Sequence, residues 1–135
     1  MTRDDVQDWL DRYVQAWRTY DPERIGDLFS ADAEYRYQPW EEPLRGRQAI
    51  VDDWRANQDA PGSWQAAYEP LVVLGDLAVT VGTTRYFGRQ NYVERLYHNL
   101  WVIRFDSEGR AREFIEWYMK EPLPEAKGSG AGSEG

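Results

Sequence analysis

Hydrophobic positions at the start of the chain recur at the spacing of an α-helix. From Val6 to Tyr20, apolar or aromatic residues return every three or four positions, which gathers them on one side of a helix. Thr2 can cap this helix, and Asp21-Pro22-Glu23 combines the capping residue, first-turn proline and early acid that begin another. A third helix is expected after Gly46. The pattern therefore predicts two nearly continuous helices and then a third.

Elsewhere the alternation of polar and apolar residues is typical of strands. A short strand at 33–37 places Tyr35 and Tyr37 on one face. Longer strands are predicted at 64–74, 77–87, 94–105 and 110–119. Gly75-Asp76 has the composition of a tight hairpin turn. The order predicts an α+β domain, in which three helices precede a mostly antiparallel sheet.

The last of these strands is apolar on both faces. One face carries Phe114, Glu116 and Tyr118, and the other carries Ile115 and Trp117. Such a strand needs a cover on each side. A carboxylate among aromatic residues must be paired, neutralised or functional, so Glu116 becomes the first candidate site residue.

Composition favours one soluble domain that does not bind nucleic acid. The chain has 135 residues, 41% of them hydrophobic and 15% aromatic, with a formal charge of −8. This charge repels phosphate backbones, and no stretch is apolar enough to span a membrane. We expect a single domain at 1–122 and a flexible Gly/Ser-rich tail at 123–135.

Several classes of site lack their required residues. Without cysteine there is no disulfide, thiol nucleophile or thiolate metal site, which favours a reducing, cytoplasmic location. His98 is the single histidine, which excludes multi-histidine metal sites. Motifs for serine hydrolases, nucleotide binding and zinc proteases are also missing. We therefore expect neither a metal nor a cofactor.

Four segments together resemble the SnoaL-like members of the nuclear transport factor 2-like superfamily, over about residues 6–122. They are the first helix with Trp17, the run at 28–33, the segment at 44–50 and the closing Glu116-Trp117-Tyr118. The resemblance implies a cone in which a curved sheet wraps around the helices and leaves a pocket at its wide end. Members include polyketide cyclases, ketosteroid isomerases, dehydratases, epoxide hydrolases and non-catalytic domains, so the resemblance does not determine the function.

Strand alternation predicts which residues line that pocket. Beside Glu116, one register of the preceding strand gives His98, Leu100, Val102 and Arg104, and Arg85 lies on the strand before it. We assign Glu116 as acid or base, His98 as its proton partner and Arg85 as an orienting group. The predicted ligand-binding residues are Tyr35, Tyr37, Trp40, Trp54, Leu100, Val102, Phe114 and Tyr118.

Two effects compete at Glu116. Burial among aromatic residues disfavours its ionised form, whereas a nearby Arg85 would favour it. Similar epoxide hydrolases place an acid and an arginine at the positions of Glu116 and Arg85, but they add a second acid where this chain has Phe87. The ketosteroid isomerase pattern is not reproduced either.

The opposite register would leave an aromatic surface on the outside of the sheet. We predict that this surface forms a homodimer, through Tyr86, Tyr97, Trp101 and Trp117. The expected function is binding of a small apolar or aromatic molecule, with cofactor-free isomerase, cyclase, dehydratase or hydrolase chemistry. The alternative is a non-catalytic ligand-binding or dimerisation module in which Glu116 is structural.

Overall fold

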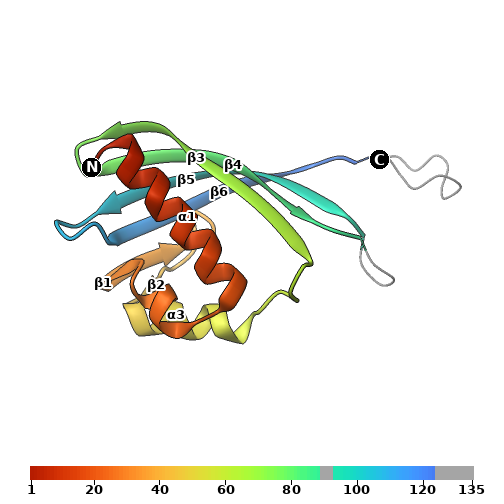
Figure 1. The fold of residues 1–135 in the computed structure, drawn as a ribbon, viewed down its shortest axis with the longest axis horizontal. Helices are drawn as coiled ribbons and strands as arrows, with labels where there is room; N and C mark the ends of the chain where they lie inside the picture. Colours follow the sequence, from red (N-terminus) through yellow and green to blue (C-terminus); the bar gives the residue numbers. More distant parts are fainter. Residues whose placement is uncertain (89–92, 124–135) are drawn as a thin grey trace, which may run out of the picture.

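The computed structural model describes residues 1–88 and 93–123 and has the predicted α+β architecture (Figure 1). The helices of this described part are α1 (Arg3–Thr19), α2 (Pro22–Gly26) and α3 (Arg47–Ala56). Its strands are β1 (Phe29–Arg36), β2 (Leu44–Arg45), β3 (Trp64–Leu74), β4 (Leu77–Tyr86), β5 (Arg95–Phe105) and β6 (Ala111–Glu121). The predicted tail from residue 124 onward, and residues 89–92 of the connection between β4 and β5, lie outside the described residues.

Local sequence signals account for the helix ends. The Thr2 side chain accepts a hydrogen bond from the Asp5 backbone N–H, and Asp5 accepts one from Thr2 in return. This capping box satisfies donors that the first turn leaves free. Asp21 caps α2 in the same position that the sequence predicted, with Pro22 in its first turn.

All strands join one sheet in the order β2-β1-β6-β5-β4-β3. Strands β3 to β6 form the predicted antiparallel meander, and Gly75, with a φ of 60°, turns the first hairpin. The first strand begins at Phe29 rather than at residue 33, and it pairs with β6 in parallel. The short strand β2 was not predicted, since two residues carry no readable alternation.

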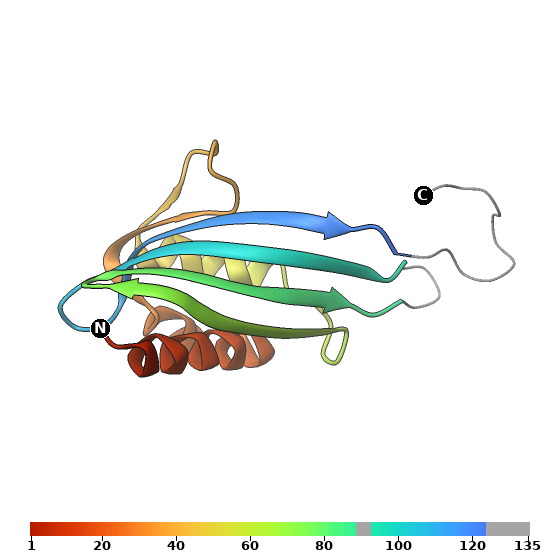
Figure 2. The ribbon, with the colours of Figure 1, turned by 90° about the horizontal axis from the view of Figure 1, so that it is seen from above.

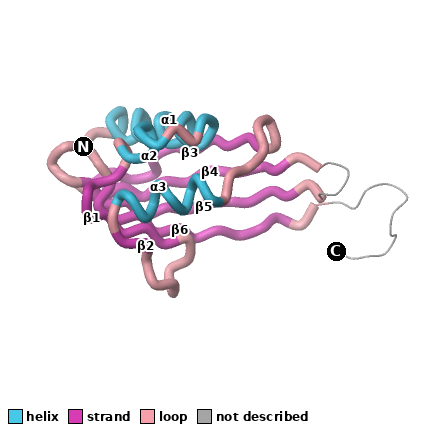
Figure 3. Tube along the Cα trace, turned by 90° about the horizontal axis from the view of Figure 1, so that it is seen from below, coloured by secondary structure: helices cyan, strands magenta, loops and turns pink. Residues whose placement is uncertain are grey.

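The helices cover one face of the sheet (Figures 2 and 3). Helix α1 packs along β3, and α3 packs on β1 and β2. The core lies between these layers and is built around Trp9, Tyr13 and Phe114, whose rings contact one another. The far ends of β4, β5 and β6 extend past the helices (Figures 1 and 2). No helix in residues 1–88 or 93–123 is long and apolar enough to cross a membrane.

The predicted faces of β4 and β5 are wrong. Trp101 pairs with Glu116 and Asn99 with Tyr118, so these β5 residues share the helix-covered face. The face opposite the helices carries the residues assigned to the pocket, namely Arg85, His98, Leu100, Val102 and Arg104. The outward set predicted for a dimer, Tyr86, Tyr97 and Trp101, faces inward instead. Register is a property of strand pairing, and a one-residue error in phase exchanges the faces of a whole strand.

Candidate functional site

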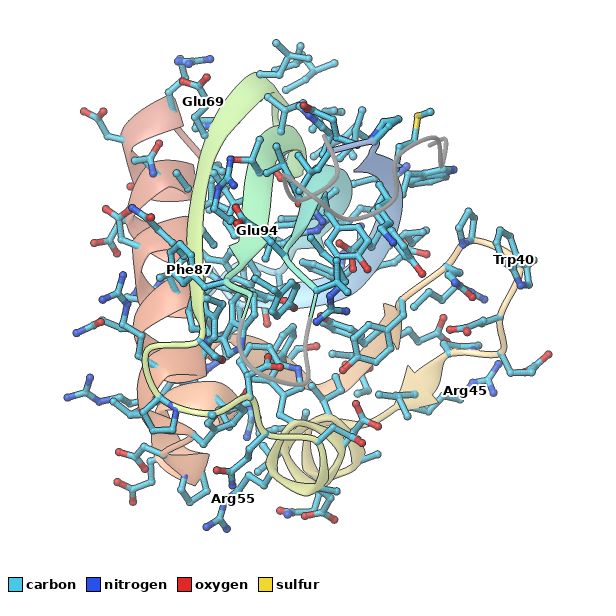
Figure 4. All side chains as sticks on the ribbon, turned by 90° about the vertical axis from the view of Figure 1, so that its right-hand side faces the viewer. Trp40, Arg45, Arg55, Glu69, Phe87 and Glu94 are labelled. Atoms are coloured by element: carbon cyan, nitrogen blue, oxygen red, sulfur yellow. The ribbon has the colours of Figure 1, made fainter. Side chains whose placement is uncertain are left out.

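A cavity of about 530 Å³ lies between the sheet and the helices. It is enclosed by the C-terminal halves of α1 and α3, the end of β1 and the inner face of β3 to β6. In Figure 4, the side chains between α1, α3 and the sheet are seen from this end of the molecule. Eleven lining residues are aromatic, eight of them tyrosines and three tryptophans. Such a concave, mostly aromatic space suits a small organic molecule.

Glu116 supplies a half-buried carboxylate to this cavity. Burial raises its pKa above the usual range, because the ionised form loses water. Two neighbours act in the opposite direction. The Asn99 amide donates to Oε2 of Glu116 at 2.6 Å, and the Trp101 indole N–H lies near enough to lower the pKa. The indole N–H does not reach hydrogen-bond geometry, so Asn99 is the neighbour that holds Glu116 in place.

Asn99 belongs to a chain of hydrogen bonds that crosses the inner face of the sheet. Its Oδ1 accepts from the Thr84 hydroxyl at 2.9 Å, and the Thr84 oxygen lies 2.5 Å from the Tyr68 hydroxyl. Since Thr84 uses its own hydrogen on Asn99, Tyr68 must donate to Thr84. These buried polar groups therefore satisfy one another, and no side chain or backbone group of the described residues donates to Oε1 of Glu116.

The tyrosines at the inner end of the cavity form a second polar pair. The hydroxyls of Tyr13 and Tyr35 are 2.8 Å apart and buried. Burial is the main cause that raises the pKa of both, and the Glu116 carboxylate adds to it. Only one of the two hydrogens is used between them, so the pair can donate one hydrogen bond to a ligand.

Carboxylates nearer the opening are held by aromatic donors. The Tyr37 hydroxyl donates to Asp53 at 2.6 Å, and the Trp17 indole donates to Asp59 at 3.0 Å. Arg95 lies across the ring of Tyr86, with its guanidinium carbon 4.5 Å from the ring centre. The described lining of the cavity thus contains both acidic side chains and an arginine.

The sequence analysis identified some of the residues that line this cavity. Glu116, Tyr35, Tyr37, Trp54 and Tyr118 line the cavity as predicted. Phe114 is fully buried beneath it as a core residue, stacked on Tyr35 and Tyr13.

Other predicted site residues lie elsewhere. His98 is exposed on the outer face beside Glu121, and Arg85 pairs there with Glu94. Leu100 and Val102 face outward with them. Trp40 is 78% exposed at the end of a loop and points away from the interior (Figure 4). We expected burial and a nearby Arg85 to have opposite effects on the ionisation of Glu116. Arg85 has no such effect, because it lies on the other face of the sheet.

Three residues of the polar chain were missed, namely Tyr68, Thr84 and Asn99. A signal for β5 was present, because one register ends in the large apolar residues Trp101, Ile103 and Phe105, whereas the other has Arg104 at the same end of the strand. No such signal existed for β4. Apart from Tyr86, its inner residues are small, and valines lie on its outer face, which reverses the usual pattern.

Potential metal ligands do not cluster in the described ranges, where no group of three or more His, Asp or Glu side chains could hold an ion. In a comparison with known families, a family model described as SnoaL-like domain matches residues 10–114. No curated protein matches the chain significantly.

Proposed function

From the premise that this chain belongs to the SnoaL-like domain family of the nuclear transport factor 2-like superfamily, we propose that its cavity binds a small, largely apolar molecule. We further propose that Glu116 exchanges a proton with that molecule without a cofactor. The observation that carries the proposal is a half-buried carboxylate of raised pKa in an aromatic cavity.

Glu116 has two properties that favour proton transfer, a raised pKa and one carboxylate oxygen without a hydrogen-bond donor among the described residues. Its raised pKa brings the carboxylate closer to the working pH, where a group can both accept and release a proton. Asn99 fixes Oε2, so Oε1 is the oxygen that meets the ligand. The free hydrogen of the Tyr13–Tyr35 pair can stabilise negative charge that develops on a ligand oxygen. His98 and Arg85 have no part in this mechanism.

A general proton-transfer probe tests the role of Glu116 before a natural substrate is known. In 5-nitrobenzisoxazole, a base removes the ring C–H proton, the N–O bond breaks, and a coloured cyanophenolate forms. We expect saturable turnover above the buffer rate, increasing with pH as Glu116 ionises. Glu116→Gln should remove this turnover, and Glu69→Gln, on the outer face of β3, should not. Equal turnover in wild type and Glu116→Gln would refute the assignment.

A non-catalytic binding domain remains the second candidate, and one observation favours it. Glu116 is the end of a four-residue hydrogen-bonded chain, and such chains also occur as purely structural networks. Binding of the probe with no turnover in the wild type would select this alternative. An absence of binding would exclude both candidates.

We also propose that the chain forms a homodimer through the outer face of the sheet. The aromatic set predicted from the sequence is reduced there to Trp117, which is 42% exposed. Aliphatic residues surround it on three adjacent strands, namely Val79, Val81, Leu100, Val102 and Ile115. An apolar face of this kind favours association.

Light scattering tests the dimer. Trp117→Glu should give a monomer, because it places a charge in the centre of this apolar face. Glu69→Gln, near the edge of the same face, is the control and should keep the dimer. An unchanged mass for Trp117→Glu would mean that this face is not the interface.

A further inference from the structure

The acidic side chains in the described part of the chain differ in whether an arginine lies beside them. Outside the cavity, nine acidic side chains lie within 4.0 Å of an arginine nitrogen. Within the described residues, none of the four acids that line the cavity has such a neighbour. These four are Glu41, Asp53, Asp59 and Glu116. The cavity therefore holds carboxylates that no basic side chain of residues 1–88 or 93–123 pairs with.

Among the lining side chains that the structure describes, Arg95 is the basic one, and it stands against four acids, which gives this part of the lining a formal charge of −3. Its guanidinium is already placed over the Tyr86 ring, and it can donate to the Tyr97 hydroxyl at 3.5 Å. An anionic ligand would have this one cation against four carboxylates. At the short distances inside a cavity and in a reduced dielectric, that balance disfavours an anion.

Aromatic rings in the lining also favour positive charge. The face of a tyrosine or tryptophan ring attracts a cation, and the attraction grows when the cation loses water. The cavity presents eleven such residues. Arg95 over Tyr86 is an example of this interaction at its side. The aromatic rings and the carboxylates of the lining thus both favour a positively charged ligand.

We propose that the molecule accepted by this cavity is an organic amine cation with an apolar or aromatic body. The inference rests on the proposed binding function and adds the ligand's chemical class. The ammonium group would lie near Glu116 and supply the positive charge that this carboxylate lacks among its described neighbours. The apolar body would contact the rings of Tyr13, Trp54 and Trp101.

Three probes that share a 2-naphthyl body separate charge from shape. They are 2-naphthylmethyl-trimethylammonium, 2-naphthalenemethanol and 2-naphthylacetate, and their affinities for the full chain are measured by isothermal titration calorimetry. We expect the ammonium to bind at least about tenfold more tightly than the alcohol, and the alcohol more tightly than the carboxylate.

Variants that remove one negative charge test whether the preference for the ammonium probe arises in the cavity. Glu116→Gln and, closer to the opening, Asp59→Asn should each reduce the preference for the ammonium over the alcohol several-fold. Glu69→Gln removes one charge from the outer face and should leave the preference unchanged. Asp59→Asn also keeps the test valid if Glu116→Gln does not fold.

The outcomes distinguish this inference from the function on which it rests. Equal affinity for the alcohol and the ammonium in the wild type would overturn the inference and leave the binding function standing. An equal loss of preference in Glu69→Gln and in the cavity variants would also overturn it, because overall charge would then be the cause. If none of the three probes binds, both proposals fail.

Discussion

The inner and outer faces of the sheet are built from the same strands but from different chemistry. On the inner face, β5 presents Trp101 and Asn99 to aromatic rings and to Glu116. On the outer face, it presents aliphatic Leu100 and Val102 between ion pairs such as Arg104 with Glu113. Alternation lets one strand serve both surfaces. A substitution can therefore disturb the cavity and leave the outer face intact, or the reverse.

Two tryptophans on adjacent strands give the largest contrast. Trp101 is 2% exposed and packs against three aromatic rings, whereas Trp117 is 42% exposed on the other face. Trp101→Ala should lower the free energy of unfolding by about 3–5 kcal/mol, and Trp117→Ala by less than about half of that. Urea unfolding measures both. Equal losses would contradict the inner and outer assignment.

The next largest loss of stability is expected at Gly82, where β4 lies close to β3. A Cβ atom at Gly82 would lie 2.1 Å from the Ala67 carbonyl oxygen and 2.4 Å from Cδ1 of Tyr68. Gly82→Ala should therefore cost about 3 kcal/mol, because the backbone must move to relieve the overlap. Thr83→Ala, at the next residue and on the outer face, is the control. Similar unfolding midpoints for the two variants would show that the contact between β3 and β4 can relax.

Paired threonines test the polar chain. Thr84→Val keeps the shape of the side chain but leaves Tyr68 and Asn99 without their partner. We expect a loss of about 1–3 kcal/mol in thermal or urea unfolding. Thr83→Val, on the outer face, should change stability by less than about 0.5 kcal/mol. No difference between the variants would mean that the chain contributes nothing to stability.

The smallest effect is the pH dependence that Glu116 introduces. Because its pKa in the folded protein is raised, the folded state holds this proton more tightly than the unfolded state does. Stability from this group is thus complete at low pH and decreases as pH rises from the unfolded pKa through the folded one. Glu116→Gln should be more stable than the wild type at pH 8, with the advantage lost near pH 4. An advantage that is constant with pH would contradict the raised pKa.

Prediction from sequence succeeded where the signal is local. The caps of α1 and α2, the Gly75-Asp76 turn and the faces of β6 were all correct. Glu116 was found because a carboxylate within an aromatic strand is unusual. The β5 faces could have been assigned correctly from the large apolar residues Trp101, Ile103 and Phe105, which share one register. The β4 faces could not, because Thr80, Gly82 and Thr84 give no sign of burial.

The sequence by itself determined the order of the elements, the family and the candidate carboxylate. Each depends on residues that are neighbours along the chain or on one strand. Only the tertiary structure decided which residues surround Glu116. Rings such as Tyr68 need small residues opposite them, so Gly82 faces inward, and the valines of β4 are placed outside. That choice arises from packing between strands and helices distant in sequence, which alternation along one strand does not record.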